Sequence, residues 1–256
     1  MSLPLALGPA RPVPLSAINP VAQLSAIAVV TVVLLVSADL VTPAVVLAAE
    51  IALLPAAGLT APREVFRRTW PILLSAAGVA WVNVAFGALR GAEAWLAGAT
   101  WGVRVLALAL PGVLLVASTD PVRLADALTT HWRVPERFAY GALAALRLVP
   151  LLATEWETIR LARRARGVDA GFSPVAQARL FGGTAFALLV GAIRRGTRLA
   201  TAMDARGFDS GIPRTNARGS TLHRRDAAFV TGAVVVCATA VAVSVLTGAW
   251  SPIFLG

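Results

Sequence analysis

Residues 227–250, AAFVTGAVVVCATAVAVSVLTGAW, form an apolar stretch without a charged side chain. About 20 such residues in a helix cross the hydrocarbon core of a bilayer. This stretch is therefore predicted to be a transmembrane helix. The composition agrees, because 57% of the 256 residues are hydrophobic and only 14% are charged, against about 25% charged residues in soluble domains.

Four more segments are long and apolar enough to span a membrane, and tryptophans near segment ends fit an aromatic belt at the membrane interface. The segments are Val21–Ser37, Leu40–Leu59, Trp70–Leu89 and Ala94–Ala117, and the tryptophans are Trp70, Trp95, Trp101 and Trp250. We therefore predict an all-α, multi-pass protein with about five transmembrane helices.

The distribution of arginine predicts the orientation. The net charge of +10 comes from arginine alone, since the chain has no lysine, and residues 119–225 hold seventeen arginines against eight acidic residues. The positive-inside rule places this region in the cytoplasm. The predicted organisation is a cytoplasmic tail (1–18), a four-helix transmembrane region (19–118), a cytoplasmic domain (119–225) and a final transmembrane helix (226–256).

Residues 119–225 are too polar to span the membrane and too apolar for a disordered tail. Three amphipathic helices are predicted, beginning at Asp120-Pro121, near Pro135 and near Pro174, where a capping residue or a first-turn proline starts a helix. A buried hairpin around 180–193 is an alternative for the third helix. The apolar residues that we expect to form a coupling surface are Leu148, Leu152, Trp156, Ile159, Leu189, Ile193 and Met203.

The second and third of these helices end in nearly the same words. Residues 165–171 read ARGVDAG and residues 205–211 read ARGFDSG, so the two copies lie 40 residues apart. A glycine just past a helix end closes the C-terminal cap in the left-handed conformation. The preceding arginine is then held at a rigid helix tip, where its fork of donors suits carboxylates or carbonyls of a partner. Asp169, Gly171, Asp209 and Gly211 are expected to support the turns.

The paired Ala-Arg-Gly motif resembles the signature of the T component of energy-coupling-factor (ECF) transporters, of the EcfT, CbiQ and BioN type. The opening Ile18-Asn19-Pro20-Val21-Ala22-Gln23-Leu24 is similar to the start of that family before its first span, although a basic residue often stands there in place of Gln23. The resemblance covers about residues 19–250.

The resemblance implies a non-catalytic coupling subunit of an importer for vitamins or metals such as cobalt or biotin, in the bacterial cytoplasmic membrane. Its partners would be two ABC-type ATPase subunits (EcfA-like), which bind the ATP, a substrate-capturing S component, and membrane lipids, but not nucleic acid. Arg166 and Arg206, with Ala165, Gly167, Ala205 and Gly207 around them, would seat in the two ATPases. No cofactor is expected in this chain.

Other polar residues suggest no catalytic or metal site. Phosphate-binding loops require a lysine, and His131, His223 and Cys237 are not at metal-ligand spacing. Glu50 and Arg104 lie inside predicted spans, where ionisable groups are costly, and we expect them to share a structural polar contact. The basic stretch Arg214–Arg225 is expected to contact acidic lipid.

Three alternatives were weighed. A permease of a conventional ABC importer would contact its ATPases through one short cytoplasmic helix, whereas this chain carries two matching tips. A secondary transporter would show inverted repeats or broken helices, which the sequence lacks. An intramembrane enzyme would need convergent catalytic groups, and the spans offer only Glu50 and Cys237.

Overall fold

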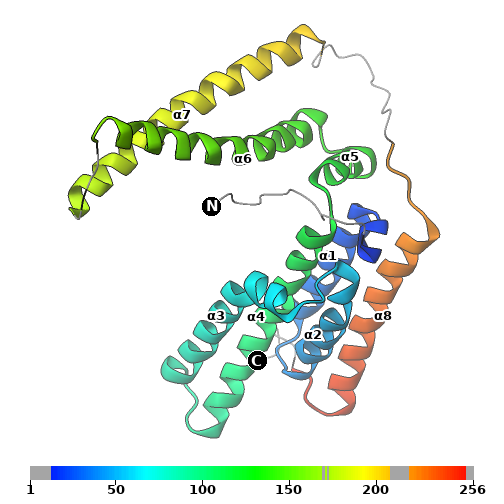
Figure 1. Cartoon of the computed structure of the whole chain (residues 1–256). Coiled ribbons are helices and arrows are strands. Elements are labelled where there is room, and N and C mark those ends of the chain that lie inside the picture. The colour runs from blue at the N-terminus through cyan, green and yellow to red at the C-terminus, as the bar shows by residue number, and fades with distance from the viewer. Residues whose placement is uncertain (1–12, 169–170, 172, 208–218, 252–256) are drawn as a thin grey trace. The chain divides into compact units, whose positions relative to one another are not determined.

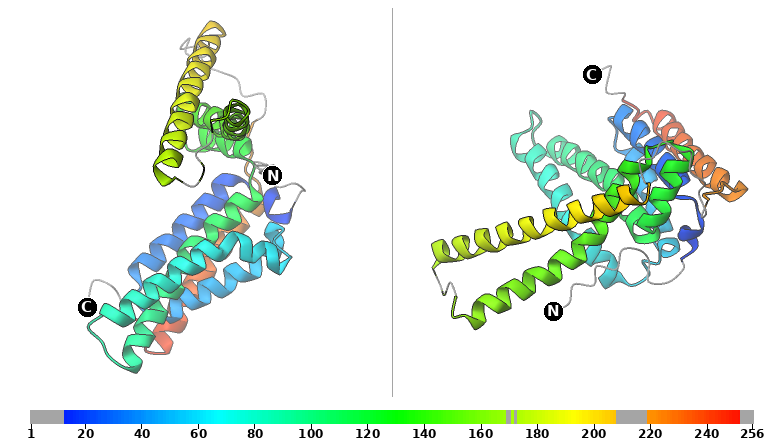
Figure 2. Two further views of the ribbon diagram at one scale, coloured as in Figure 1. Left: turned by 60° about the vertical axis from the view of Figure 1, so that its left-hand side comes forward. Right: turned by 90° about the horizontal axis from the view of Figure 1, so that it is seen from above.

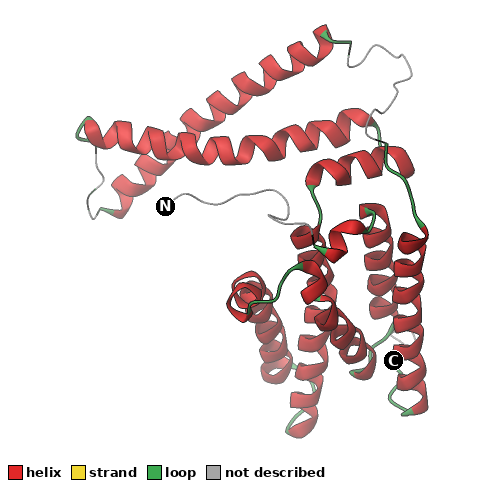
Figure 3. Ribbon diagram, turned by 45° about the vertical axis from the view of Figure 1, so that its right-hand side comes forward, coloured by secondary structure: helices red, strands yellow, loops and turns green. Residues whose placement is uncertain are grey.

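The computed structural model describes residues 13–168, 171, 173–207 and 219–251, and within these ranges the regular structure is helical (Figures 1 and 3). The all-α fold class is thereby confirmed. The elements are η1 (Pro14–Ala17), α1 (Pro20–Val36), α2 (Val41–Leu53), η2 (Pro55–Ala57), α3 (Pro62–Phe86), α4 (Ala92–Ser118), α5 (Pro121–His131), α6 (Glu136–Ala165), α7 (Pro174–Ala205) and α8 (Arg224–Leu246).

The described residues fall into two compact units. The membrane bundle comprises residues 13–132 and 219–251 and holds α1–α5 and α8. The two-helix unit comprises the described residues between 133 and 207 and holds α6 and α7. The sequence analysis grouped α5 with α6 and α7, but α5 packs against α1 in the membrane bundle.

Side-chain caps start the helices where the sequence predicted them. The Asn19 side chain accepts a hydrogen bond from the Val21 amide at 3.0 Å, and Asp120 accepts one from the Val122 amide at 2.7 Å. A proline follows each cap at the first helical position, where its missing N–H costs nothing. Local chemistry thus fixes where α1 and α5 begin.

The second helix is shorter than predicted. The apolar run Leu40–Leu59 suggested one span, but α2 ends at Leu53 and a short 3₁₀ turn, η2, follows from Pro55. Gly58 then takes φ +79°, a left-handed conformation that glycine adopts without steric cost. The proline and the glycine together end the helix inside a continuous apolar run.

Five helices are long and apolar enough to cross a membrane, namely α3, α4, α6, α7 and α8. The number matches the prediction, but the helices differ. Helices α1 and α2 have 17 and 13 residues, below the length used for that comparison, whereas α6 and α7 reach it. Length and composition therefore do not separate α6 and α7 from membrane-spanning helices.

The start of α8 is bound to the start of α1. Asp226, only 2% exposed, accepts hydrogen bonds from the Asn19 amide at 2.6 Å and from the His223 amide at 2.7 Å. The Asn19 side chain also donates to Ser220 Oγ at 2.8 Å. The sequence motif around Asn19 therefore joins the first and last helices of the bundle.

The end of α8 is bound to the turn between α1 and α2. The buried carboxylate of Asp39 accepts hydrogen bonds from the Ser244 hydroxyl and the Thr42 amide, both at 2.7 Å. Burial alone would raise the pKa of Asp39, but these hydrogen bonds outweigh it and hold the pKa below its ordinary value. Asp39 is thus stabilised as a carboxylate at this end of α8.

Small residues bring α3 and α4 close together in the bundle, where Figure 2 shows the helices side by side. A Cβ added to Gly98 would lie 2.8 Å from the Ala80 carbonyl oxygen, and one added to Gly102 would lie 3.3 Å from that of Ala76. Such close approach of backbones is characteristic of helix pairs in membranes.

We expect Gly98→Ala to destabilise the bundle by about 1–3 kcal/mol, because the new methyl group has to push the backbone of α3 away. Gly112→Ala on the same helix is the matched control, since nothing lies within 4 Å of its added Cβ. Thermal unfolding of both variants in detergent checks this. Equal unfolding temperatures for the two variants would contradict the close packing.

The orientation can be tested with single cysteines in a Cys237→Ser background. The membrane-impermeant maleimide should label Glu93→Cys in intact cells, because residue 93 begins α4 on the predicted external side. Val175→Cys, in the exposed first turn of α7, should be labelled only after permeabilisation. External labelling of Val175→Cys would show that α6 crosses the membrane.

Candidate functional site

The two Ala-Arg-Gly motifs have the same backbone geometry. Arg166 has φ −90° and ψ 9°, and Arg206 has φ −90° and ψ 8°. Gly167 and Gly207, which follow them, both have φ +73°. Two segments 40 residues apart in the chain thus fold into equivalent helix ends, which we call tip 1 (Ala165–Gly167) and tip 2 (Ala205–Gly207).

Backbone hydrogen bonds fix each tip. At tip 1, the Gly167 amide donates to the Arg164 carbonyl at 2.9 Å and the Val168 amide donates to the Arg163 carbonyl at 3.0 Å. This pair of bonds is the Schellman motif, which requires the left-handed residue that glycine supplies. At tip 2, the Gly207 amide makes the corresponding bond to the Asp204 carbonyl at 2.9 Å.

Both arginine side chains of the tips are exposed. Each arginine is the residue at the helix end itself, one position beyond the last full turn in which the sequence analysis placed it. Gly171 lies in the turn after tip 1 with φ +50°. The predicted supporting residues Asp169, Asp209 and Gly211 lie outside the described residues.

The tips lie at opposite ends of the two-helix unit. Tip 1 stands at the connection between α6 and α7, and tip 2 stands at the far end of α7 (Figure 1). Helix α7 has 32 residues, and at 1.5 Å per residue it separates its two ends by about 48 Å. Two separate partner sites can therefore be reached at once.

Hydrogen bonds hold α6 and α7 together near tip 1. Arg163 Nη1 on α6 donates to the Leu180 carbonyl and to Thr184 Oγ1 on α7, both at 3.1 Å. Further along the pair, Arg195 donates to Glu155 at 2.5 Å. The Trp156 and Phe181 rings meet edge to face, with centroids 5.2 Å apart. The two helices are thus joined over several turns.

The sequence analysis missed Arg163, Glu155 and Arg195 as contact residues. Their signal was the glycine content of the third predicted helix. A Cβ added to Gly183 would lie 3.2 Å from Arg163 Nη1, and one added to Gly191 would lie 3.4 Å from Glu155 Oε1. Glycines inside a helix often mark a close approach, and these two admit side chains from α6.

The predicted apolar surface is divided by its exposure. Leu148, Leu152, Trp156 and Ile159 on α6 are all half-buried, as expected of one helical face. On α7, Met203 is half-buried, whereas Leu189 and Ile193 are 57% and 61% exposed. The exposed pair is available to a partner or to lipid.

The expected contact between Glu50 and Arg104 is wrong. Both are buried, but neither carboxylate oxygen of Glu50 has a hydrogen-bond partner, and Arg104 donates to the Ser37 carbonyl. Arg104 also stacks on Trp101, with its guanidinium carbon 4.9 Å from the ring centroid.

The reason is the position of Glu50 along the chain. The turn at Ser37, which holds Arg104, precedes α2, and Glu50 lies about 13 Å beyond the first residue of that helix. The sequence analysis took residue 50 as the middle of a longer span and so gave both residues the same depth. Because α2 ends at Leu53, Glu50 lies near its end instead.

The described residues contain no group of three or more histidine, cysteine, aspartate or glutamate side chains that could hold a metal ion. The candidate site is therefore the pair of tips together with the helices that carry them. This arrangement defines a class of protein: a helical membrane protein that presents two equivalent, arginine-bearing helix ends.

Comparison with known proteins gives the family. Residues 13–216 match the CbiQ family, described as "Cobalt transport protein". The chain belongs to this family, and the ECF T-component resemblance found in the sequence is confirmed. Its membership and its apolar helices identify it as a multi-pass membrane protein.

Curated relatives carry the name "Energy-coupling factor transporter transmembrane protein EcfT". The chain is 36% identical over 141 residues to that of Limosilactobacillus fermentum, covering 52% of this chain and 53% of the relative. It is 34% identical over 167 residues to that of Lacticaseibacillus paracasei, covering 62% and 60%. The matches therefore span about half to three fifths of each relative.

We expect Gly167→Ala to loosen tip 1, because a left-handed conformation costs a residue with a Cβ about 1–2 kcal/mol. Hydrogen exchange of the amides of Gly167 and Val168 should accelerate about five-fold or more. Gly182→Ala, in the interior of α7 with open space around its added Cβ, is the control and should not accelerate exchange at its own turn. Unchanged exchange in Gly167→Ala would refute the predicted strain.

Proposed function

We propose that the chain is the non-catalytic coupling subunit of an ECF-type importer, with tips 1 and 2 seated on two ABC-type ATPase subunits. The observation that carries the proposal is the identical geometry of the tips. Two equal contact elements about 48 Å apart suit two equal partner subunits. An exposed guanidinium in a fixed position can form paired hydrogen bonds with a carboxylate or with backbone carbonyls.

The proposed coupling is mechanical. When ATP binding draws the two ATPases together, each tip follows its own subunit, and the joined helices α6 and α7 pass the movement on. The exposed Leu189 and Ile193, with the half-buried apolar residues of α6, form the surface on which a substrate-capturing S component would rest. ATP binding and hydrolysis belong to the ATPase subunits in this proposal.

The proposed location is the bacterial cytoplasmic membrane, with the N-terminus and the two-helix unit on the cytoplasmic side. The seventeen arginines of residues 119–225 support it. The substrate class proposed from the family is a vitamin or a metal ion, and the family description names cobalt. The S component selects the substrate in this proposal.

The test is co-expression with the ATPase pair and an S component, followed by co-purification and substrate uptake. The Arg166→Ala/Arg206→Ala double variant should insert in the membrane but lose the ATPases or uptake. We expect each single variant to lose less, because one tip still holds its subunit.

The control is Arg147→Ala/Arg194→Ala, which also removes one exposed arginine from each of α6 and α7, away from the tips. It should retain ATPase binding and uptake. A double tip variant that holds both ATPases and transports normally would reduce the motifs to helix caps, and the proposed function would fall.

A further inference from the structure

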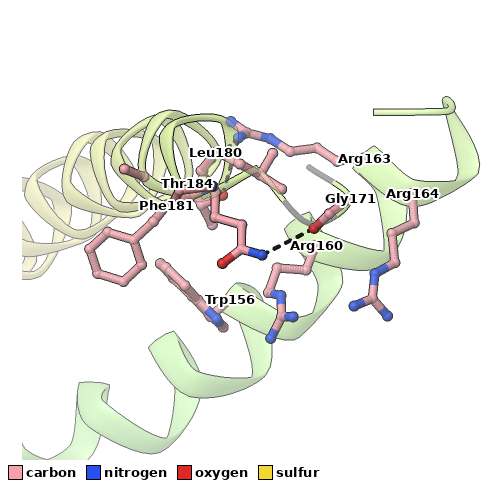
Figure 4. Close-up of a pocket in the computed structure, with 11 residues that line it drawn as sticks. Trp156, Arg160, Arg163, Arg164, Gly171, Leu180, Phe181 and Thr184 are labelled. Carbon is pink, nitrogen blue, oxygen red and sulfur yellow. Dashed lines mark hydrogen bonds between the residues drawn. The ribbon is translucent and has the colours of Figure 1, made fainter. Parts of the chain in front are cut away.

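A pocket lies between α6 and α7 beside tip 1, and it is rich in arginine (Figure 4). Arg160, Arg163 and Arg164 line it from α6, and Gln177 and Phe181 are among the residues that line it from α7. No acidic residue is among those that line it. The proposed coupling function uses Arg166 and leaves these three arginines without a role.

One arginine forms a fixed wall of the pocket. Arg163 Nη1 is engaged by the Leu180 carbonyl and by Thr184, which is only 1% exposed. Gly183 makes room for the guanidinium, as its missing Cβ would lie 3.2 Å away. On the opposite side, the Gln177 amide donates to the Gly171 carbonyl at 3.0 Å and ties the turn to α7. The pocket is thus built by defined contacts.

The other two arginines lie one helical turn apart and are exposed. Elsewhere in the described chain, arginines such as Arg68 and Arg195 pair with glutamates. Arg160 and Arg164 form no ion pair with any described residue. Three guanidinium groups without a carboxylate form a site for an anion, and phosphate groups match their fork of donors.

Apolar side chains border the same pocket. Trp156 and Phe181 meet edge to face within its lining, and Phe181 is 63% exposed. Leu161 on α6 and Val175 on α7 are 64% and 69% exposed. A ligand that joins a phosphate to hydrocarbon satisfies both halves of this surface, whereas free phosphate satisfies only the arginines.

We infer that this pocket binds the headgroup phosphate of an anionic phospholipid, with its acyl chains along the exposed apolar side chains of α6 and α7. Arg160 and Arg164 bind the phosphate with the pre-positioned Arg163. The bound lipid anchors the two-helix unit to a membrane surface next to tip 1. This inference needs no partner subunit and stands apart from the coupling proposal.

The test uses the full-length chain in detergent, stripped of lipid and titrated with phosphatidylglycerol, phosphatidylcholine or inorganic phosphate. Bound molecules are counted by native mass spectrometry. Phosphatidylglycerol should bind more tightly than the other two. Arg160→Gln/Arg164→Gln should weaken its binding about 30-fold, at about five-fold for each arginine near a lipid surface.

Arg194→Gln/Arg198→Gln is the matched control, since it removes two exposed arginines one turn apart on α7 that do not line the pocket. It should change phosphatidylglycerol binding by less than about three-fold. An equal loss in both double variants would show a general effect of charge and overturn the inference.

Three further outcomes would also overturn it. Equal binding of phosphatidylcholine would remove the anionic preference, and equally tight inorganic phosphate would show a free-phosphate site. If the Arg160→Gln/Arg164→Gln variant keeps phosphatidylglycerol but loses co-purified ATPase subunits, the pocket is a protein-docking site.

Discussion

Two buried carboxylates hold the last helix of the membrane bundle to its first two. Asp226 binds the Asn19 amide at the start of α8, and Asp39 binds Ser244 near its end. The order of these contacts makes α1 and α8 parallel, so both begin on the same side of the bundle. With α2, α3 and α4 each crossing, α6 and α7 therefore either both cross or both stay on the side where α8 begins.

The function proposed for the tips depends on a second constraint, which is the fixed conformation of a helix end. A lone arginine on a helix surface loses side-chain freedom when it binds a partner. In the tips, at least the backbone is already fixed, because the Schellman bonds and a left-handed glycine define where the helix stops. A displacement of the partner is then transmitted to the helix axis instead of being absorbed by a flexible end.

Local sequence signals predicted the helix boundaries well where a capping residue or a proline marked them. Asp120-Pro121 and Pro174 gave the starts of α5 and α7, and the Ala-Arg-Gly motifs gave the ends of α6 and α7. Hydrophobicity alone failed at α2, because Pro55 and Gly58 end the helix within an apolar run, and the error carried over to the Glu50–Arg104 pair. Contacts between distant segments, such as Arg163 with Thr184, depend on how α6 and α7 pack, which no local pattern specifies.

The bonds between α6 and α7 also make the two tips mechanically unequal. The described side-chain bonds between these helices all fall between Leu180 and Arg195 on α7. Tip 1 lies within a turn of the Arg163 contact, so it is braced against α7. Tip 2 lies ten residues beyond Arg195, about 15 Å at the rise of a helix. A force on tip 1 therefore acts on both helices together, whereas a force on tip 2 acts on a projecting arm of α7 and reaches α6 through the Arg195–Glu155 pair first.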